Sequence, residues 1–458
     1  QKDAPFTQVM APGHDRPRCV YVEFLSTGPA VSQTLRTKVI RTEGIRRVGD
    51  LIVTDLVVRD GECVGAVALH VPTGDTVTIA ARSTIVATGG LTRLYRRNSA
   101  SSNMGGDGYA LALRAGAELI DMEFVQFFPI GHLAPRMIGM DPIMWDPFRY
   151  KLGGKLLNGR MEAFTQNYGA SGEDGKYVIT RDQATYAITK EVAAGRGSPH
   201  GGAYLSFQHL SEATLREAFG PVVDRLAKNG IDLTKTPIEV APMAHYHMGG
   251  VRVDVAMRTS VPGLFAAGEA VGGANGANRL SGNAITEAFA FGRAAGRTAA
   301  SRGKSNAARW NGTGEEVRWL DGARTEPQRT QSVNPAATLE TLQALMTDDV
   351  GPFRTDAGLR GALTRVEAMR AELGTVPPRA GDGMDAALID WLDLRQMLVV
   401  AECVTRAAIA RTESRGAHQR EDFPGLDESW RVNQVIRLCG DRLDIERHQV
   451  PAPAKAAA

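Results

Sequence analysis

The chain has 458 residues, of which 43% are hydrophobic and 23% are charged; these values are typical of globular proteins, and the length suits about three domains. Its formal net charge of +2 argues against a nucleic-acid-binding protein, because such proteins usually carry a basic surface. The 4 cysteines are widely spaced without a CxxC motif, which argues against iron–sulfur, zinc and haem ligand sets and favours a reducing compartment.

The N-terminal quarter of the sequence predicts a β-meander followed by a buried strand. Residues 1–50 contain no GxGxxG fingerprint, the glycine-rich turn that holds a dinucleotide phosphate. Strands are expected within Leu51–Ala80, where Asp60-Gly61 is a strong hairpin signal. An apolar run at Thr84–Gly90 then predicts a buried strand that ends in two glycines.

Two histidines alternate in the middle of the chain. A helix is expected at Tyr109–Ala115, and His245 and His247 lie further on, two residues apart. On a strand they share one face. That spacing fits hydrogen-bonded core residues as well as a ligand site. The sequence near them offers no acidic or cysteine partner at metal-ligand spacing, so no metal site is expected.

The stretch from Gly263 to Arg297 has the features of a ligand cradle. A short strand at Leu264–Ala267 is followed by Glu269, a glycine- and asparagine-rich loop containing Arg279, and a helix for which Asn283 is a suitable N-cap. Ligands bind at the carboxyl ends of strands in open α/β sheets, and helix N-termini attract anions. An ordinary strand–helix unit with a flexible loop fits this stretch alone equally well.

The C-terminal third predicts a helical region. The polar stretch 301–336 is expected to be a linker with little structure of its own. Helical spacing follows in two segments, one ending at Gly374 and one running over about Asp385–Thr412. The apolar stripes of these helices indicate core packing, and the tail 451–458 is expected to be disordered.

Nearly the whole chain resembles the flavoproteins of the succinate dehydrogenase, fumarate reductase and L-aspartate oxidase superfamily. The resemblance rests on the motifs TIVATGG, GGDG, MEFVQFFPIG, GGKLLN, RDQATYAITKEVAAGRG, HYHMGG, AAGEA, GANRLSGNAI, FGRAAG and RTESRGAHQREDFP. It does not extend to the family's N-terminal GxGxxG segment. His418, in the last motif, is expected to be structural.

The resemblance implies a multidomain α/β (α+β) fold with a Rossmann-like FAD-binding domain that is incomplete at its N-terminal end. The implied parts are an FAD-binding domain at 1–125 and 243–300, an inserted capping domain at 126–242, the linker at 301–336, and a C-terminal helical domain at 337–450.

FAD is the cofactor that the resemblance implies. Glu269 would hold ribose or ribityl hydroxyls, and the helix start at Ala284–Ile285 would face the flavin's pyrimidine edge. The implied cofactor-binding residues are Thr88, Gly89, Gly90, Asp107, Glu269, Asn283, Ala284 and Ile285.

The family's catalytic residues also have counterparts here. Arg181 aligns with its proton-donating arginine, although Arg181 and Asp182 alone fit a solvated pair at a helix start. Arg279 and His245 would clamp one substrate carboxylate, since a guanidinium binds a carboxylate through two parallel hydrogen bonds. Phe128 and His247 complete the predicted substrate-binding set.

Four departures from the family pattern concern the substrate. Phe128 replaces a histidine, and Ile130 and His247 each replace a threonine. Asp146-Pro147 stands where the family has a Thr-Glu pair that binds the second carboxylate. We therefore expect a substrate with one carboxylate and a less polar group at the other end, unless His247 or Arg149 compensates.

The expected function is FAD-dependent interconversion of a saturated carboxylate and its α,β-unsaturated form. The alternative is a truncated or non-catalytic chain that needs another polypeptide to complete the FAD site. Expected partners are a small carboxylate and an electron-transfer subunit, with no nucleic acid. No apolar run reaches the roughly 20 residues of a membrane span, so we expect a cytoplasmic protein, peripheral at a membrane only through a partner.

Overall fold

The computed structural model describes residue 8 and residues 15–138, 143–145, 152–169, 171–173, 176–178, 181–305, 310–325, 333–377 and 384–450. The chain forms two compact units. The first comprises Gln1–Arg96, Ser101–Val125 and Tyr246–Ala458, and the second comprises Arg97–Ala100 and Gln126–His245. The longer segment of the second unit overlaps the capping domain expected at 126–242.

The first unit begins with helix α1 (Glu23–Arg41) and the expected β-meander. Strands β1 (Leu51–Arg59), β2 (Glu62–His70) and β3 (Asp75–Ala80) form a three-stranded antiparallel sheet. Arg59 pairs with Glu62, and the intervening Asp60 and Gly61 have φ of 51° and 75°. Positive φ at both central residues is the geometry of a tight hairpin turn, so the predicted hairpin is confirmed.

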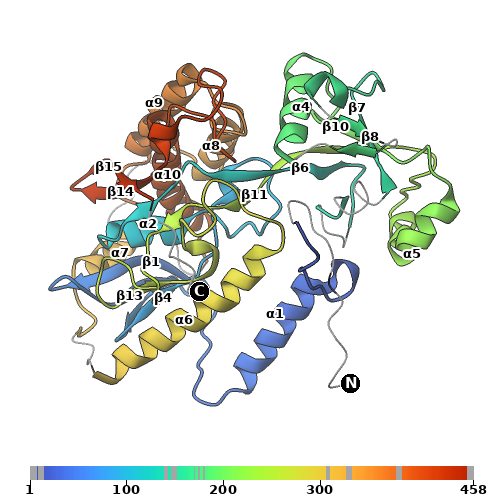
Figure 1. Cartoon of the computed structure of the whole chain (residues 1–458). Helices are drawn as coiled ribbons and strands as arrows, with labels where there is room; N and C mark the ends of the chain where they lie inside the picture. The colour runs from blue at the N-terminus through green and yellow to red at the C-terminus, as the bar shows by residue number, and fades with distance from the viewer. Residues whose placement is uncertain are drawn as a thin grey trace, which may run out of the picture. The chain divides into compact units, whose positions relative to one another are not determined.

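A short parallel pair of strands forms the centre of the cradle region. Strand β4 (Thr84–Val86) pairs with β13 (Leu264–Ala266), and together they form a two-stranded sheet. Helix α6 (Asn283–Ser305) packs against both strands (Figure 1). Strand β2 also contacts β4. Helix α6 begins at Asn283, within one residue of the predicted N-cap position.

The helical region is smaller than predicted. Helices α8 (Pro335–Asp349), α9 (Asp356–Leu373) and α10 (Ala386–Ala410) pack against one another. Beyond them the chain forms strands β14 (Val432–Cys439) and β15 (Arg442–Gln449), so the region expected to be a helical domain, 337–450, ends in a β-hairpin that was not predicted from the sequence. The positive φ of Gly440, 62°, permits the hairpin between the two strands.

These two strands belong to a sheet assembled from distant parts of the sequence. They join β5 (Leu119–Ile120) and β12 (Gly250–Val251) in the order β12-β5-β14-β15. At their junction with α10, the fully buried His418 accepts a hydrogen bond from Arg354 Nη1 at 2.7 Å. Arg411 Nε donates to Glu123 Oε1 at 2.6 Å, and both of these side chains are also buried. His418 therefore occupies a structural network, as expected.

The predicted linker contains a packed helix. Helix α6 continues to Ser305, and α7 (Glu315–Thr325) packs on β2 and β3. Arg59 donates to both carboxylate oxygens of Glu316, at 2.9 and 2.8 Å, and Leu320 is fully buried. This helix was not predicted because the segment is mostly polar, and a helix needs only a narrow apolar stripe to pack on a sheet. The rest of the linker, at 306–309 and 326–332, and the tail 451–458 lie outside the described residues.

The second unit contains a four-stranded sheet in the order β6-β11-β10-β7. The strands are β6 (Val125–Ala134), β7 (Lys155–Leu157), β10 (Ala203–Ser206) and β11 (Ile238–His247). Helix α4 (Arg181–Ala193) contacts β10, and α5 (Glu212–Lys228) and the hairpin of β8 (Ser171–Glu173) with β9 (Lys176–Val178) complete the unit.

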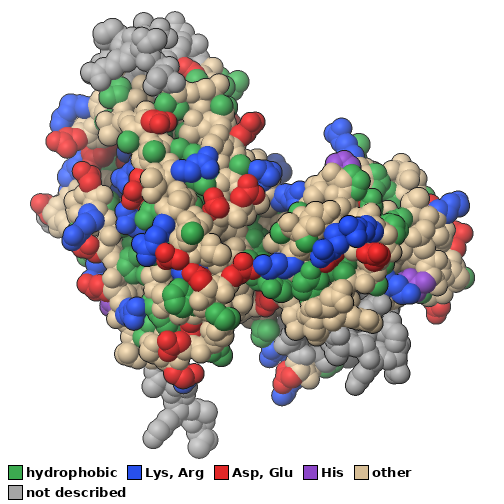
Figure 2. Space-filling model, turned by 90° about the horizontal axis from the view of Figure 1, so that it is seen from above, with side chains coloured by type: hydrophobic (Ala, Val, Ile, Leu, Met, Phe, Trp, Pro, Cys, Tyr) green, Lys and Arg blue, Asp and Glu red, His purple; other side chains and the backbone are tan. Residues whose placement is uncertain are grey.

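The surface carries a mixture of charges. Figure 2 shows Lys and Arg side chains interspersed with Asp and Glu over the visible face, in keeping with the net charge of +2. Among the helices in the described part of the chain, none combines the length and apolar character needed to cross a membrane.

Candidate functional site

The structure brings Glu269 and Gly90 together. Strand β13 leads directly into a single 3₁₀ turn, Gly268–Ala270, which carries Glu269. A Cβ added at Gly90 would lie 2.3 Å from Glu269 Oε1, so only glycine fits beside this carboxylate. Burial raises the pKa of Glu269 to about 7, although the backbone N–H of His247 and the charge of Arg279 oppose the rise. A partly buried acceptor therefore lies at the carboxyl end of β13.

A second group of predicted cofactor residues lies at the start of helix α2 (Asp107–Arg114). A Cβ at Gly108 would lie 2.0 Å from Thr88 Oγ1, which shows how closely the turn after β4 approaches the helix. Gly89 has a φ of 79°, and burial raises the pKa of Asp107. Thr88 and Asp107 also line a cavity in the described part of the chain.

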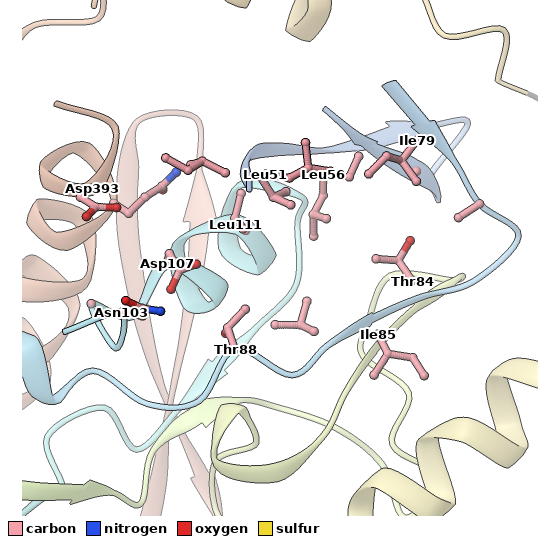
Figure 3. Close-up of a pocket in the computed structure, with 18 of the residues that line it drawn as sticks. Leu51, Leu56, Ile79, Thr84, Ile85, Thr88, Asn103, Asp107, Leu111 and Asp393 are labelled. Carbon is pink, nitrogen blue, oxygen red and sulfur yellow. The ribbon is translucent and has the colours of Figure 1, made fainter. Parts of the chain in front are cut away.

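This cavity has a volume of about 720 Å³ and is mainly aliphatic. Its walls come from the meander, β4, α2 and α10. Figure 3 shows Asp107, Asn103 and Asp393 gathered at one end, whereas Leu51, Leu56 and Ile79 line the other. The cavity extends along β4, whose Ile85 is 39% exposed.

The start of α6 carries the remaining predicted cofactor residues. Ala284 packs against a buried cluster that includes Phe124 and Tyr246. Ile285 is 39% exposed, so it borders open space. The first-turn N–H groups of a helix have no partner within that helix and can serve an electron-rich ligand edge.

Arg279 lies just before this helix and is largely buried. Its guanidinium lies 4.3 Å from the centre of the Tyr246 ring. The Tyr246 hydroxyl donates to Glu287 Oε2 at 2.8 Å, and Asn275 Nδ2 donates to the same oxygen at 2.9 Å. Tyr246 thus provides a platform for the cation. The sequence offers only a weak indication of this role, since Tyr246 lies between His245 and His247.

In the second unit, Arg181, Phe128 and His245 lie together. Arg181 begins α4, and its guanidinium lies 5.4 Å from the centre of the Phe128 ring. The rings of Phe128 and His245 are 5.7 Å apart. Ser99 Oγ lies 2.8 Å from His245 Nδ1 and fixes the orientation of the imidazole. Sequence reasoning missed Ser99, because nothing in its local pattern marks it.

The substrate-binding prediction for His247 is wrong in this structure. Its side chain is fully buried, with Nδ1 3.2 Å from the Tyr109 hydroxyl and Nε2 3.1 Å from the carbonyl oxygen of Met122. Burial lowers the pKa of His247 to about 4. Both ring nitrogens have protein partners, so the ring cannot serve a substrate without breaking those bonds.

Two predicted features lie outside the described residues: the Asp146-Pro147 replacement and Arg149. Within the described ranges, no group of three or more His, Cys, Asp or Glu side chains is arranged to hold a metal ion. Arg279 belongs to the first unit and His245 to the second, so their joint carboxylate clamp remains a prediction.

Comparison with known proteins identifies the family. Residues 4–285 match the model of the FAD binding domain, and residues 339–453 match that of the fumarate reductase flavoprotein C-terminal region. The chain belongs to this family of flavoproteins. FAD is therefore its cofactor, and it is a FAD-dependent enzyme of the dehydrogenase and reductase class.

Two curated relatives illustrate the similarity of this flavoprotein to the family. A subunit of the CoM/CoB fumarate reductase of Methanothermobacter marburgensis is 38% identical over 383 residues, which cover 82% of this chain and 68% of that protein. The fumarate reductase flavoprotein subunit of Escherichia coli is 34% identical over 385 residues, covering 79% and 62%. The flavoprotein thus spans about two thirds of the length of these relatives.

Solved structures agree with this assignment. Sdh1 of Mycobacterium smegmatis in its apo form aligns with a TM-score of 0.85 and 33% identity, over 99% of this chain and 78% of that one. The residues described above fit FAD: a carboxylate beside a glycine that lacks room for a Cβ, followed by an accessible helix start.

Proposed function

We propose that this flavoprotein interconverts a saturated carboxylate and its α,β-unsaturated form. Oxidation removes a hydride from one carbon and a proton from its neighbour. Bound FAD supplies the hydride acceptor, which no side chain can provide. Arg181 would take the proton in the oxidising direction and return it in the reducing direction, and Arg279 with His245 would hold the carboxylate.

The observation that carries this proposal is the cluster of Arg181, Phe128 and His245 within one unit. Ser99 orients His245, and the Phe128 ring lies within cation–π distance of Arg181. A proton-carrying cation and a carboxylate-binding imidazole therefore share one aromatic neighbour. This arrangement supports the proposal that Arg181 and His245 act on the same substrate.

The same cluster favours a substrate with a single carboxylate. Phe128 and Ile130 are both buried, and neither side chain carries a hydrogen-bond donor. A buried carboxylate without a partner costs several kcal/mol. The relatives are named as fumarate reductases, and the departures at Phe128 and Ile130 argue that this flavoprotein acts on a compound with a less polar end.

Substrate profiling of the FAD-loaded, full-length protein tests this proposal. Crotonate, in which a methyl group replaces one carboxylate of fumarate, should be reduced with a higher kcat/KM than fumarate. Phe128→His should shift this ratio toward fumarate by roughly tenfold, since it restores one hydrogen-bond donor. The control Phe127→His adds an imidazole on the opposite face of β6. A strong fumarate preference that neither variant changes would contradict the substrate assignment.

A specific observation also favours the second candidate, in which a further polypeptide segment completes the FAD site. Parallel sheets are normally larger and covered on both faces, but in the described residues β4 has only β13 as a partner. Beside it lie the aliphatic cavity and the outer face of α6, where Ile285 and Phe289 are 39% and 46% exposed. We propose that another strand, ending in a phosphate-binding glycine turn, pairs with β4.

Titration with FAD tests this second proposal. The 458-residue chain should bind FAD weakly, because the pyrophosphate lacks a helix N-terminus. Adding a βαβ segment with a GxGxxG turn, in the same chain or as a separate polypeptide, should give tight binding. Retention of yellow flavin by the 458-residue chain through dialysis would overturn the proposal.

We propose further that the flavoprotein exchanges electrons with a partner subunit, through which it associates with a membrane from the cytoplasmic side. The naming of its relatives as subunits supports a partner. Affinity purification from native cells, followed by flotation of the complex with lipid vesicles, tests the association. Recovery of the flavoprotein without a redox partner and away from the vesicles would contradict it.

A further inference from the structure

We propose that His247 is a positioning residue, which together with Tyr109 holds Glu269 in place for the flavin nucleotide. The inference rests on the proposed role of Glu269 in binding FAD hydroxyls. It assigns to His247 a task different from the substrate contact that its sequence position predicts.

The tautomer of His247 follows from its partners. Nε2 lies 3.1 Å from the carbonyl oxygen of Met122, which can only accept, so Nε2 carries the proton and donates it. The pKa of about 4 keeps the ring neutral at physiological pH. Nδ1 therefore carries a lone pair, which faces the Tyr109 hydroxyl at 3.2 Å.

Tyr109 connects the ring back to Glu269. Its hydroxyl lies 3.0 Å from the main-chain oxygen of Glu269, so its single proton has two acceptors, this oxygen and His247 Nδ1. The backbone N–H of His247 donates to Glu269 Oε1 at 3.0 Å. Tyr109 and His247 thus hold Glu269 at both its main chain and its carboxylate.

Packing leaves this group little freedom. A Cβ at Gly250 would lie 3.0 Å from Tyr109 Cε1, and one at Gly90 would lie 2.3 Å from Glu269 Oε1. The Tyr109 and His247 rings are in contact, with centroids 5.3 Å apart. The two ring nitrogens of His247 lie on different sides of the ring, which lets the side chain contact both Met122 and Tyr109.

The hydrogen bond from His247 also affects the charge of Glu269. Burial and the nearby Glu287 raise the pKa of Glu269, while the His247 N–H and Arg279 lower it. Tyr109 and Tyr246, whose own pKa values are raised, remain neutral, and so does the His247 ring. An ionised Glu269 accepts hydrogen bonds from ribose or ribityl hydroxyls. Displacing the N–H would move the midpoint of FAD binding to higher pH.

The experiment measures FAD affinity by fluorescence quenching between pH 5.5 and 8.5, using the full-length protein. His247→Leu and Tyr109→Phe should each weaken binding about tenfold, the effect of a lost hydrogen bond of ordinary strength, and His247→Leu should raise the pH midpoint. His247→Gln, which retains a donor and an acceptor, should bind nearly as well as wild type. Because the two residues act together, the double variant should bind no more weakly than the weaker single variant.

A matched control separates positioning from general destabilisation. Tyr95 is another buried tyrosine, whose hydroxyl donates to the carbonyl oxygen of Val350 at 3.3 Å. Tyr95→Phe should leave the pH midpoint of FAD binding unchanged. If His247→Leu fails to fold, Tyr109→Phe and His247→Gln still decide the question.

Two outcomes would overturn the inference. One is wild-type affinity and pH dependence in Tyr109→Phe and His247→Leu, and the other is additive losses in the double variant. Glu269→Gln tests the proposed role of Glu269 in FAD binding separately. If this variant keeps the wild-type FAD affinity and pH dependence, then Glu269 is not a flavin ligand, and the inference about His247 fails for that reason.

Discussion

The guanidinium of Arg181 lies 5.4 Å from the centre of the Phe128 ring. A cation held over an aromatic face is stabilised by about 0.5–2 kcal/mol, depending on its exposure to solvent. The contact therefore helps to give the proposed proton carrier a defined position next to Phe128, whose ring also lies near His245, the proposed carboxylate ligand. Phe128 is expected to influence both catalysis and specificity.

The first prediction separates proton transfer from carboxylate binding. Arg181→Gln should lower kcat by about 10²–10⁴-fold, the usual contribution of a general acid or base, with little change in the substrate Kd. Arg279→Gln should raise the Kd as well, because it removes a carboxylate ligand. Steady-state kinetics with equilibrium binding measures both. Arg216→Gln, on the exposed face of α5, is the control, and unchanged kcat in the Arg181 variant would eliminate the proton-shuttle role.

The second prediction concerns the glycine beside Glu269. Gly90→Ala places a Cβ where the carboxylate now lies, 2.3 Å from Oε1, so Glu269 must turn away and FAD affinity should fall by at least tenfold. Gly361→Ala in α9 provides the control, since no atom lies within 4 Å of its added Cβ. Alanine there should stabilise the helix by about 1 kcal/mol. Isothermal titration with FAD and urea denaturation measure the two effects, and undiminished FAD affinity in Gly90→Ala would be inconsistent with the cradle.

The third prediction is the pH dependence conferred by His247. Unfolded histidine binds a proton below about pH 6.5, whereas the pKa of folded His247 is about 4. Between these values the unfolded state binds more protons, so stability falls as the pH falls, by up to about 1.4 kcal/mol per pH unit. His247→Gln should remove this contribution. Urea denaturation from pH 7.5 to 4.5 measures it, and parallel stability curves for the variant and wild type would show that the prediction is wrong.

The fourth prediction concerns the buried pair of Arg411 and Glu123. Their 2.6 Å hydrogen bond lies among side chains with almost no solvent exposure. Arg411→Met should lower the free energy of unfolding by about 3–5 kcal/mol, because Glu123 would be left as an uncompensated charge. The double variant Arg411→Met with Glu123→Gln should recover part of this loss. The surface pair of Arg360 and Asp356 offers a control, because breaking an exposed ion pair should change the free energy of unfolding much less.

Local patterns predicted the elements whose signals lie close together in the sequence. The hairpin at Asp60-Gly61, the strand before Glu269 and the helix at Ala386–Ala410 are all confirmed. Each depends on turn residues or on apolar periodicity within a few residues. The family motifs extended this reasoning to the cofactor, which neither periodicity nor spacing alone identifies.

Local patterns could not predict which side chains are buried by residues far away in the sequence. Both His245 and His247 lie on strand β11, where side chains two residues apart share one face. Contacts with Tyr109 and Met122, which are distant in the sequence, make His247 a core residue. Helix α7 was hidden for a related reason, since its packing depends on β2 and β3 far away in the sequence. Ser99 contacts His245 across 146 positions, a separation that no local pattern encodes.

The boundary between the two units falls inside strand β11, between His245 and Tyr246. Only one residue separates the proposed carboxylate ligand His245 from His247, whose backbone N–H holds Glu269. A shift of the strand when substrate binds would therefore be transmitted along a continuous extended backbone, which is stiffer than a loop. If bound FAD strengthens substrate binding by some factor, then by thermodynamic reciprocity bound substrate strengthens FAD binding by the same factor.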